Sequence, residues 1–318
     1  MIVNPAAGRG RARRLWPQVA AALAAEGLRF ELAQTRAPGE AEQLAESAAG
    51  YGAVIAVGGD GTVHEVVNGL MRVPQGRRPA LGVLPLGSGD DYAKMVPPRA
   101  PGGPRARWQD AVQRMLRGAA RAHDVGVMRN EEEGERYFAN GMDVGFGAHV
   151  AQNFTTLPRW LPGLGGYLAA IARTMLRYPA LELNLRLDDG APVAQRSTIT
   201  AVMNGRCFGG SFWACPGASA DDGLLDVLIA DEVSRAQILR LVPKLMRGRH
   251  LGEPVLRVAR ARRVRIESDA PLPVEADGEL PWRAARRLEI GVLPGALRVL
   301  GAVESQPPRG GDVEGGSA

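Results

Sequence analysis

Apolar and polar positions alternate along the first hundred residues in blocks that predict strands followed by helices. The segment 53–57 is a short, mostly β-branched apolar run, and it ends abruptly in the glycines at 58, 59 and 61. Apolar residues then recur at helical spacing: Val63, Val66, Val67 and Leu70. The pattern predicts a strand, a tight turn and a helix.

The same reasoning predicts further elements in this part of the chain. Strands are expected at residues 2–3, 28–35 and 80–84, and helices at 11–26, 40–49 and 108–116. A new helix is expected to start after the glycine-rich segment 87–91. No internal repeat is evident.

Alternation of strands and helices is typical of a mostly parallel sheet that is covered on both faces. Ligands of such sheets bind at the carboxyl ends of the strands. The loops at Asn4, Thr35, Asp60 and Ser88 each follow a predicted strand. We therefore expect these four residues to meet along one edge of the sheet.

The pattern changes from about His123 onward. Short strand-like segments separated by turns predict a mainly antiparallel β domain with few helices, of which residues 161–178 form the clearest. The expected domains are an α/β domain at 1–123 and a β domain at 124–288. The glycine-rich end, 306–318, is expected to be a disordered tail.

Composition narrows the functional classes. The 318 residues are enough for two domains, and 39 Lys+Arg against 34 Asp+Glu give a net charge of +5. This mild excess suits a phosphate-bearing ligand or an anionic membrane. Aromatic residues are only 5% and do not alternate with basic ones, so nucleic acid is not expected as a partner.

Cellular location is predicted from what the sequence lacks. The two cysteines are too few for a zinc site with four scattered histidines, and reduced thiols fit a cytoplasmic protein. Neither a signal peptide nor an apolar run of about 20 residues is found. Any membrane contact is therefore expected to be peripheral, and the native start is left open upstream of Met1.

The turn around Asp60 is the first candidate for chemistry. Glycines at 58, 59 and 61 let a phosphate approach the main chain, and the amides and dipole of the following helix attract an anion. A carboxylate at such a site calls for a cation, which suggests Mg²⁺ with a nucleotide. The alternative is a turn with a purely structural role.

Four acidic segments have both a structural and a functional interpretation. Thr62 with Glu65, and Ser88 with Asp91, have capping-box spacing. Asp221 and Asp222 precede a glycine in a turn that suits a divalent cation, or is a plain Asp-Gly turn. The turn containing Asp277 and Glu279 has the same two interpretations: a cation-binding turn or a plain hairpin turn.

Taken together, these segments resemble the diacylglycerol kinase catalytic-domain family, which includes soluble bacterial lipid kinases and sphingosine kinases. The matching motifs, in family order, are Asn4-Pro-x-x-Gly8, Gly58-Gly-Asp-Gly-Thr62 with Glu65, Leu86-Gly-Ser-Gly-Asp-Asp-Tyr-Ala93, Asp221-Asp-Gly223 and Asp277-Gly-Glu279. The glycine turn alone is shared with NAD kinases and phosphofructokinases, whereas the later motifs are specific to the lipid kinases.

The resemblance implies a fold and a set of site residues. The first domain would be an α/β domain like those of phosphofructokinases and NAD kinases, the second a β-sandwich, and residues 289–305 would return to the first domain. ATP would bind between the domains. The implied nucleotide-site residues are Asn4, Thr35, Gly58, Gly59, Asp60, Gly61, Thr62 and Ser88, with Glu65 in support.

It also implies catalytic roles. Asp277 matches the general base with Glu279 beside it, Asp60 would organise Mg²⁺ and ATP, and Asp221 and Asp222 match a structural Mg²⁺ turn. A charge network would contain Asp91, Asp124 and Arg9. One departure stands out: the family's usual Gly-Thr-x-Asn-Asp-Phe has Asp90 in place of asparagine, which adds a negative charge and removes an amide donor.

The resulting hypothesis is ATP-dependent phosphorylation of a hydroxyl of a lipid such as diacylglycerol, at the inner face of a membrane. A sphingoid base or phosphatidylglycerol is the alternative acceptor, and NAD kinase is a weaker alternative. A non-catalytic nucleotide or lipid sensor is the alternative from a different class. Formation of a homodimer is left open.

Overall fold

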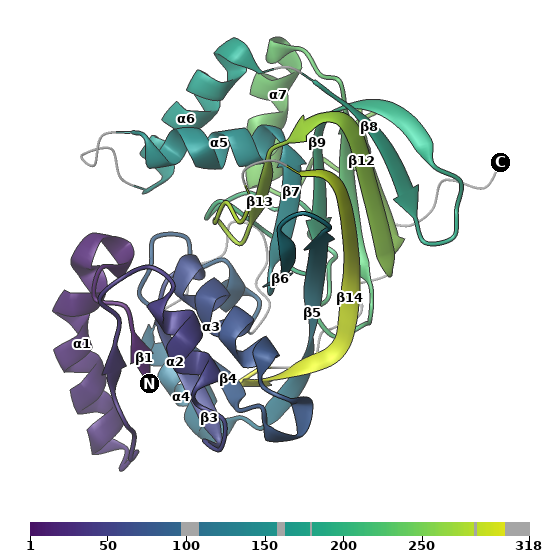
Figure 1. Ribbon diagram of the computed structural model, residues 1–318. Coiled ribbons are helices and arrows are strands. Elements are labelled where there is room, and N and C mark those ends of the chain that lie inside the picture. The colour runs from purple at the N-terminus through teal and green to yellow at the C-terminus, as the bar shows by residue number, and fades with distance from the viewer. Residues whose placement is uncertain (97–107, 158–162, 179, 283–284, 303–318) are drawn as a thin grey trace.

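The computed structural model of the protein describes residues 1–96, 108–157, 163–178, 180–282 and 285–302. The expected tail at 306–318 lies outside these residues. Figure 1 shows a helix-rich part built from the start of the chain and a strand-rich part built from the rest. An N-terminal α/β domain and a mainly antiparallel second domain confirm the predicted fold class.

The first domain is a parallel sheet with helices on both faces. Its strands are β1 (Ile2–Val3), β2 (Ala33–Gln34), β3 (Ala53–Gly58) and β4 (Ala80–Pro85), in the order β4-β3-β1-β2. Its helices are α1 (Ala7–Ala25), α2 (Glu40–Glu46), α3 (Asp60–Arg72) and α4 (Trp108–Arg117). The fully apolar sequence of β3 is explained by this arrangement, since parallel strands are buried on both faces.

The core confirms that burial. On one face of β3, Val54 and Ala56 pack in the cluster that contains Val66 of α3. On the other face, Ile55 and Val57 pack in the cluster that contains Val19 of α1. The side chains of β3 therefore hold helices on both sides of the sheet.

The second domain consists mainly of antiparallel strands, with helices gathered at one end (Figure 1). The strands are β5 (Ala120–Asn130), β6 (Gly134–Phe138), β7 (Gly141–Gly145), β8 (Leu181–Leu187), β9 (Val193–Met203), β10 (Leu225–Asp231), β11 (Leu256–Ala261), β12 (Arg263–Leu272), β13 (Val274–Ala276) and β14 (Ala285–Leu300). The helices are α5 (Phe146–Thr155), α6 (Gly163–Arg177) and α7 (Arg235–Met246).

Strand β14 joins the two domains. It pairs antiparallel with β12 and with β5, and near its end Val299 pairs in parallel with Leu81 of β4. Gly295, at φ +58°, lies in the irregular stretch between the two halves of the β5 pairing. One continuous sheet therefore runs through both domains.

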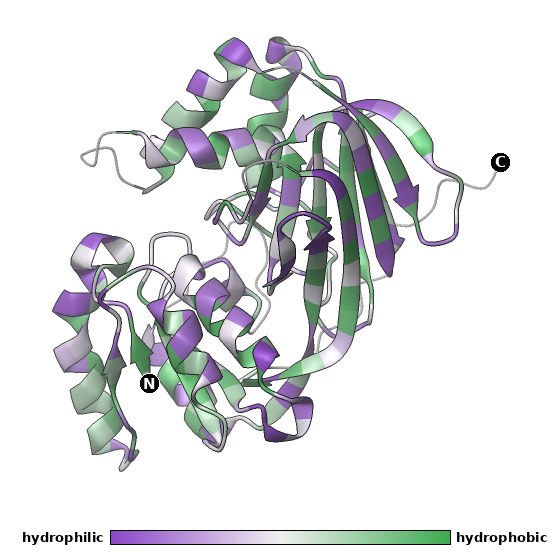
Figure 2. Cartoon of the chain, viewed as in Figure 1, coloured by the Kyte–Doolittle hydropathy of each residue, from purple (hydrophilic) through white to green (hydrophobic). Residues whose placement is uncertain are grey.

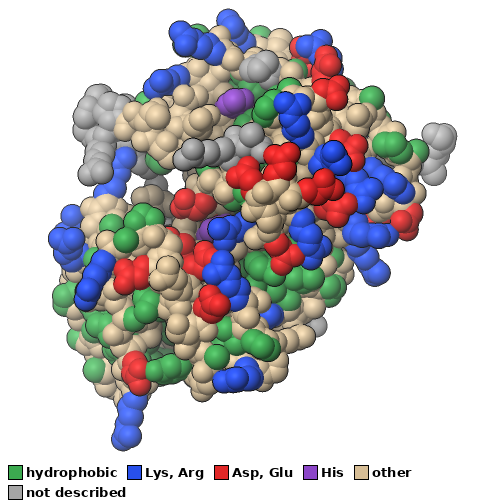
Figure 3. Space-filling view, viewed as in Figure 1, with side chains coloured by type: hydrophobic (Ala, Val, Ile, Leu, Met, Phe, Trp, Pro, Cys, Tyr) green, Lys and Arg blue, Asp and Glu red, His purple; other side chains and the backbone are tan. Residues whose placement is uncertain are grey.

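Successive residues of strands β8 and β12 alternate between apolar and polar, so one face of these strands is buried and the other is exposed (Figure 2). Figure 3 shows basic and acidic side chains intermixed on that side. The pairs include Arg263 with Asp189 at 2.8 Å and Arg265 with Glu289 at 2.6 Å. These arginine charges are thus neutralised by neighbouring carboxylates.

Several expected elements differ from the observed ones. The strand predicted at 28–35 is reduced to Ala33–Gln34, and the helix expected after Ser88 is one 3₁₀ turn, Tyr92–Lys94. Helices α5 and α7 were not predicted. In α7, Pro243 interrupts the apolar pattern, yet a capping box at Ser234 and Gln237 starts the helix.

In the described part of the chain, no helix combines the length and the apolar character needed to cross a membrane.

Candidate active site

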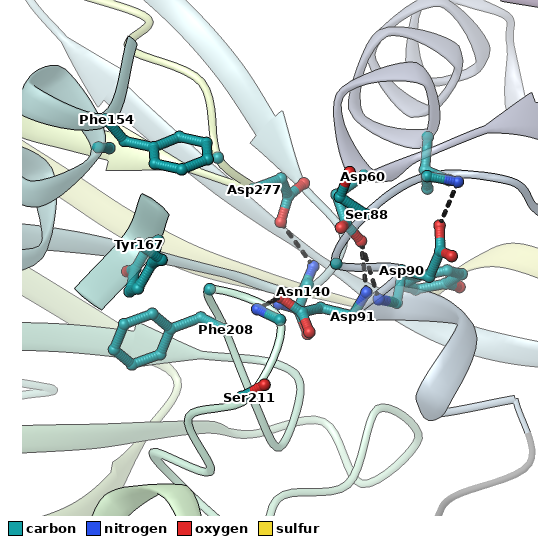
Figure 4. A pocket seen from close by; sticks show the side chains of 18 of the residues that line it. Asp60, Ser88, Asp90, Asp91, Asn140, Phe154, Tyr167, Phe208, Ser211 and Asp277 are labelled. Atoms are coloured by element: carbon teal, nitrogen blue, oxygen red, sulfur yellow. Dashed lines mark hydrogen bonds between the residues drawn. The ribbon is translucent and has the colours of Figure 1, made fainter. Parts of the chain in front are cut away.

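A cleft of about 560 Å³ lies between the two domains. The first domain contributes Arg9, Arg11, Asp60 and the turn at 87–91. The second domain contributes Asn140 and Asp277, together with the aromatic residues Phe154, Tyr167 and Phe208 (Figure 4). The cleft therefore has an acidic, glycine-lined end and an aromatic end.

Two glycine turns form the acidic end because β3 and β4 are neighbours and end at the same edge of the sheet, where Gly58 pairs with Pro85. The turns touch through their main chains. A Cβ added to Gly59 would lie 3.0 Å from Cα of Gly87, and one added to Gly87 would lie 2.3 Å from Cα of Gly59. Only glycine allows this approach.

Asp60 is the first residue of α3, and its carboxylate connects the two turns. Its Oδ1 accepts the backbone N–H of Asp91 at 2.6 Å and of Tyr92 at 3.3 Å (Figure 4). Its Oδ2 lies on the side of Gly89, where an added Cβ would be 2.7 Å away. Burial, followed by the charges of Asp91 and Asp90, raises the pKa of Asp60 well above its usual range.

Asp91 pairs with a lysine that the sequence reasoning did not identify. Lys94 Nζ donates to Asp91 Oδ1 and to the carbonyl of Gly210, each at 2.6 Å, and the Gly210 N–H donates to Asp91 Oδ2 at 2.7 Å. Burial lowers the pKa of Lys94, but Asp91 and nearby acidic groups outweigh it, so the net shift is upward. The pair attaches the second glycine turn to the second domain.

Asp90 adopts a left-handed conformation, with φ +54°, and its Oδ1 accepts the N–H of Gly87 at 2.8 Å. Burial raises the pKa of Asp90 to about 6. Arg11 is the nearby cation, and its Nη1 donates to the carbonyl of Gly87 at 3.3 Å. An asparagine would make the same hydrogen bond without the charge.

Asp277 faces this end from the other domain. It follows β13 in a left-handed conformation, with φ +50°, and it is 7% exposed. Backbone N–H groups of Ala139, Asn140 and Gly141 donate to it at 2.9, 2.9 and 3.1 Å, and His64 Nδ1 lies 3.2 Å from its Oδ2. The carboxylate is therefore held in one orientation.

Glu279 lies against the first glycine turn. A Cβ added to Gly61 would be 2.5 Å from Oε1 of Glu279, so a side chain at this position would displace the Glu279 carboxylate. Desolvation raises the pKa of Glu279. Glu279 thus brings a second carboxylate from the β domain to the start of α3.

Other predicted nucleotide-site residues support the turn. Nδ2 of Asn4 donates to Oγ1 of Thr62 at 3.1 Å, and the Thr62 side chain fills the space where Gly58 lacks a Cβ. The N–H of Thr35 donates to the carbonyl of Val3 at 2.9 Å, which extends the pairing of β1 and β2. The Asn4–Thr62 contact therefore supports the glycine turn, whereas Thr35 lies at the end of β2, two strands away from β3.

The expected capping boxes do not form. Helix α3 begins at Asp60, two residues before Thr62, so Thr62 lies inside the helix. Glu65 instead accepts the N–H groups of Gly39 and Ala41 at 2.9 and 3.1 Å, which caps the start of α2. At Ser88 the chain makes a tight turn that is closed by Asp90.

The acidic turn at Asp221 and Asp222 has a basic partner. Asp222 forms an ion pair with Arg260 and accepts the N–H of Leu224 at 3.0 Å, and Asp221 accepts the Ser219 hydroxyl at 2.5 Å. Among the described residues, no group of three or more His, Cys, Asp or Glu is arranged to hold a metal ion. Arg260 therefore supplies positive charge at this turn, and the Mg²⁺ site at Asp221 and Asp222 stays a prediction.

Asp124 forms a hydrogen bond with the same turn. Its Oδ2 accepts the N–H of Gly223 at 2.7 Å, and its Oδ1 accepts the N–H of Gly295 on β14 at 2.8 Å. Asp124 thereby links the acidic turn to β14, whereas Asp91 pairs with Lys94 at the cleft. Arg9 lines the cleft from the start of α1, with φ +58°.

A buried carboxyl pair lies under the turn that carries Asp277. Asp143 of β7 and Glu275 of β13 are directly opposite in the antiparallel pairing. Burial raises the pKa of both groups, and the pair is expected to share a proton because two adjacent charges would repel. The Gly278 N–H donates to Glu275, so the pair supports the turn.

The aromatic end is built by α5, α6 and the loop at 208–212. Phe154 and Tyr167 lie with ring centroids 5.9 Å apart, and Tyr167 and Phe212 lie 5.3 Å apart. A Cβ at Gly209 would be 2.6 Å from the Tyr167 ring. Tyr167 of α6 and Phe154 of α5 therefore form an apolar wall of the cleft.

Comparison with known families gives two adjacent matches. The diacylglycerol kinase catalytic domain matches residues 1–128, and the YegS C-terminal NAD kinase beta sandwich-like domain matches residues 140–301. The two matches cover the α/β domain and the β domain in turn.

Individual relatives cover most of the chain. A diacylglycerol kinase of Mycobacterium tuberculosis (strain CDC 1551 / Oshkosh) is 30% identical over 301 residues, which are 94% of this chain and 93% of the relative. A probable lipid kinase YegS-like protein of Chromohalobacter salexigens is 34% identical over 265 residues, 81% of this chain and 79% of the relative.

Solved structures share the fold. A diacylglycerol kinase from Bacillus anthracis str. Sterne superposes with a TM-score of 0.63 at 20% identity, over 94% of each chain. A second structure from the same organism reaches a TM-score of 0.70 at 25% identity, over 94% of this chain and 95% of the other.

Proposed function

The chain belongs to the diacylglycerol kinase catalytic-domain family, and from this premise we propose that it is an ATP-dependent lipid kinase acting on a lipid hydroxyl, such as that of diacylglycerol. The observation that carries the proposal is the two-ended cleft. Its glycine-lined end suits phosphates, its aromatic end suits an apolar chain, and Asp277 lies between them (Figure 4).

The glycine-lined end supports nucleotide binding. The N-terminus of α3 and the amides of two glycine turns favour an anion, and Arg9 and Arg11 line the same region. Asp60 presents one oxygen on the cleft side, which fits a divalent cation. Mg²⁺ bound with ATP would shield charge between Asp60 and the phosphates.

Phosphoryl transfer requires mainly positioning and charge neutralisation. In the proposed reaction the acceptor oxygen bonds to the γ-phosphorus as the bond to the β-phosphate oxygen breaks. The hydroxyl proton passes to Asp277, whose carboxylate is fixed by the amides at residues 139–141.

The apolar surface near the aromatic end supports access from a bilayer. Leu176 at the end of α6 is 66% exposed and Leu239 of α7 is 64% exposed. Arg177 and Arg235 lie on the same two helices and suit anionic headgroups. We propose peripheral membrane contact through this helical end, so that the lipid enters beside Tyr167.

The test is ATP consumption against a panel of lipids in mixed micelles, for the wild type and for Asp277→Ala. Asp277→Ala should reduce turnover by roughly 10²–10⁴ fold, the usual range for loss of a general base. The exposed Asp189→Ala serves as the control and should keep the wild-type rate. A near-wild-type rate for Asp277→Ala would refute the role of this carboxylate.

The panel also separates the alternatives. Preference for a sphingoid base or phosphatidylglycerol would keep the kinase proposal and change the acceptor. Measurable ATP binding without turnover on any lipid would favour a nucleotide or lipid sensor instead.

A further inference from the structure

The helix that begins at Asp60 also carries a histidine that reaches the other domain. His64 lies on α3 and is only 8% exposed, and its Nδ1 is 3.2 Å from Oδ2 of Asp277. Residues four apart share one face of a helix. Helix α3 therefore presents Asp60 at the phosphate end of the cleft and His64 beside the carboxylate that faces it.

The Asp277 carboxylate determines which nitrogen of His64 carries the hydrogen. The N–H of Tyr137 donates to Oδ1 of Asn68 at 3.0 Å, so the main chain fixes the orientation of the Asn68 amide. Its Nδ2 donates its two hydrogens to the carbonyls of Tyr137 and His64, both at 2.9 Å, and lies 3.3 Å from Nε2 of His64. A carboxylate oxygen accepts, so Nδ1 of His64, 3.2 Å from Oδ2 of Asp277, is the nitrogen that donates.

The donors to Asp277 come from both domains. Among the described residues, three are backbone N–H groups at 139–141, in the same domain as Asp277. His64 is the donor from the nucleotide-binding side. Removing the imidazole would leave the carboxylate anchored within its own domain but no longer aligned with α3.

We propose that His64 is a positioning residue for catalysis: its Nδ1–H holds the Asp277 carboxylate in register with the helix that starts at the phosphate site. The inference rests on the proposed kinase function, because it assigns a role within the same reaction. It predicts that the hydrogen bond matters for the rate of phosphoryl transfer and not for nucleotide binding.

The competing interpretation is a buried histidine that only fills space and satisfies its neighbours. The two interpretations differ in which substitution restores activity. His64→Leu retains most of the volume and removes the donor. His64→Asn loses volume, but its amide Nδ2 lies about where the imidazole Nδ1 lies and can donate to Asp277.

We expect His64→Leu to lower kcat by roughly 10- to 100-fold, since small misplacements of reacting groups have effects of that size, with the KM for ATP within about twofold of the wild type. His64→Asn should recover kcat to within about fivefold of the wild type. A purely structural role predicts the reverse order, because asparagine leaves the larger void. Equal rates for the leucine variant and the wild type would overturn the proposal.

A second measurement does not depend on turnover. Nitrogen-15 NMR of the imidazoles, with the His64 signal assigned by its loss in His64→Asn, should show the tautomer with hydrogen on Nδ1. The nitrogen-15 chemical shift of Nδ1 of His64 should change in Asp277→Ala. A hydrogen on Nε2, or a His64 signal indifferent to Asp277→Ala, would refute the contact even if no lipid in the panel were phosphorylated.

The outcomes for the two proposals are distinguishable. Lack of lipid-dependent turnover in the wild type counts against the proposed function alone, while the NMR result still decides whether His64 holds Asp277. If the wild type is active and His64→Leu turns over at the same rate, the result counts against the positioning role of His64 alone. Thermal unfolding of both His64 variants identifies any loss of rate that comes from misfolding.

Discussion

Asp90 carries a charge at a position where the fold needs only a carbonyl oxygen. Its left-handed backbone and its bond from Gly87 suit asparagine equally well. The carboxylate adds to the charges of Asp60 and Asp91 beside the proposed phosphate site. Its raised pKa means that the folded protein binds this proton more tightly than the unfolded chain, so the folded state loses stability as the pH rises from about 4 to above 6 and Asp90 ionises.

Asp90→Asn should therefore strengthen ATP binding. We expect the KM for ATP to fall about 3- to 10-fold at pH 8, equivalent to ~1 kcal/mol of removed repulsion. The difference should shrink at pH 5.5, where wild-type Asp90 becomes protonated. Steady-state kinetics at both pH values provide the test, and a weaker ATP affinity in the variant would show that the carboxylate binds the nucleotide or its cation.

For single residues, the sequence predicted a place in the site when the neighbouring residues in the chain determine that place. Asp60 and Ser88 follow apolar strands and glycines, so their place at the sheet edge could be read from the pattern. His64 and Lys94 could not be identified, because their partners, Asp277 and the Gly210 carbonyl, are distant in the chain. Long-range polar contacts leave no periodic signal.

Helix α3 is the element on which the site depends, and its packing against α2 is unusually close. A Cβ added to Gly69 would lie 2.1 Å from the carbonyl oxygen of Glu42 and 2.8 Å from Cβ of Ala45. Glu65 also reaches from α3 to cap α2. The two helices are therefore joined by close packing and by hydrogen bonds.

Gly69→Ala should destabilise the protein although alanine favours helix by ~1 kcal/mol. Overpacking against α2 is expected to cost about 1–3 kcal/mol, which exceeds the gain. Gly165→Ala in α6 is the matched control, because an added Cβ there meets nothing within 4 Å, and it should stabilise. Urea unfolding of both variants measures whether each substitution raises or lowers the free energy of unfolding. A rise in both variants would contradict the close packing of α3 against α2.

Element prediction succeeded where one periodicity dominated, as in β3 and α6. It failed at α5, which begins at Phe146 directly after β7, with Gly145 at φ +114° as its N-cap, so no loop residues mark the change. Residues 28–32 alternate as a strand would, but the sheet pairs only Ala33–Gln34 with β1. Alternation shows which faces are apolar and does not supply a partner strand.

At the scale of the molecule, β14 and the cleft contacts predict cooperative unfolding. The strand is hydrogen-bonded in both domains, and Lys94 and His64 bridge them at the cleft. Differential scanning calorimetry should show one transition rather than two. Two separated transitions, with only one shifted by ATP, would show that the sheet does not couple the domains.

The position of β14 in the chain also affects how the protein is made. Strand β4 leaves the ribosome early, but Val299, which covers its edge at Leu81, is among the last described residues to be synthesised. At about 5–20 residues per second, translation of the intervening segment takes roughly 10–40 s. During this interval the nascent first domain exposes an uncovered sheet edge, a surface prone to pairing with other chains and to binding by chaperones.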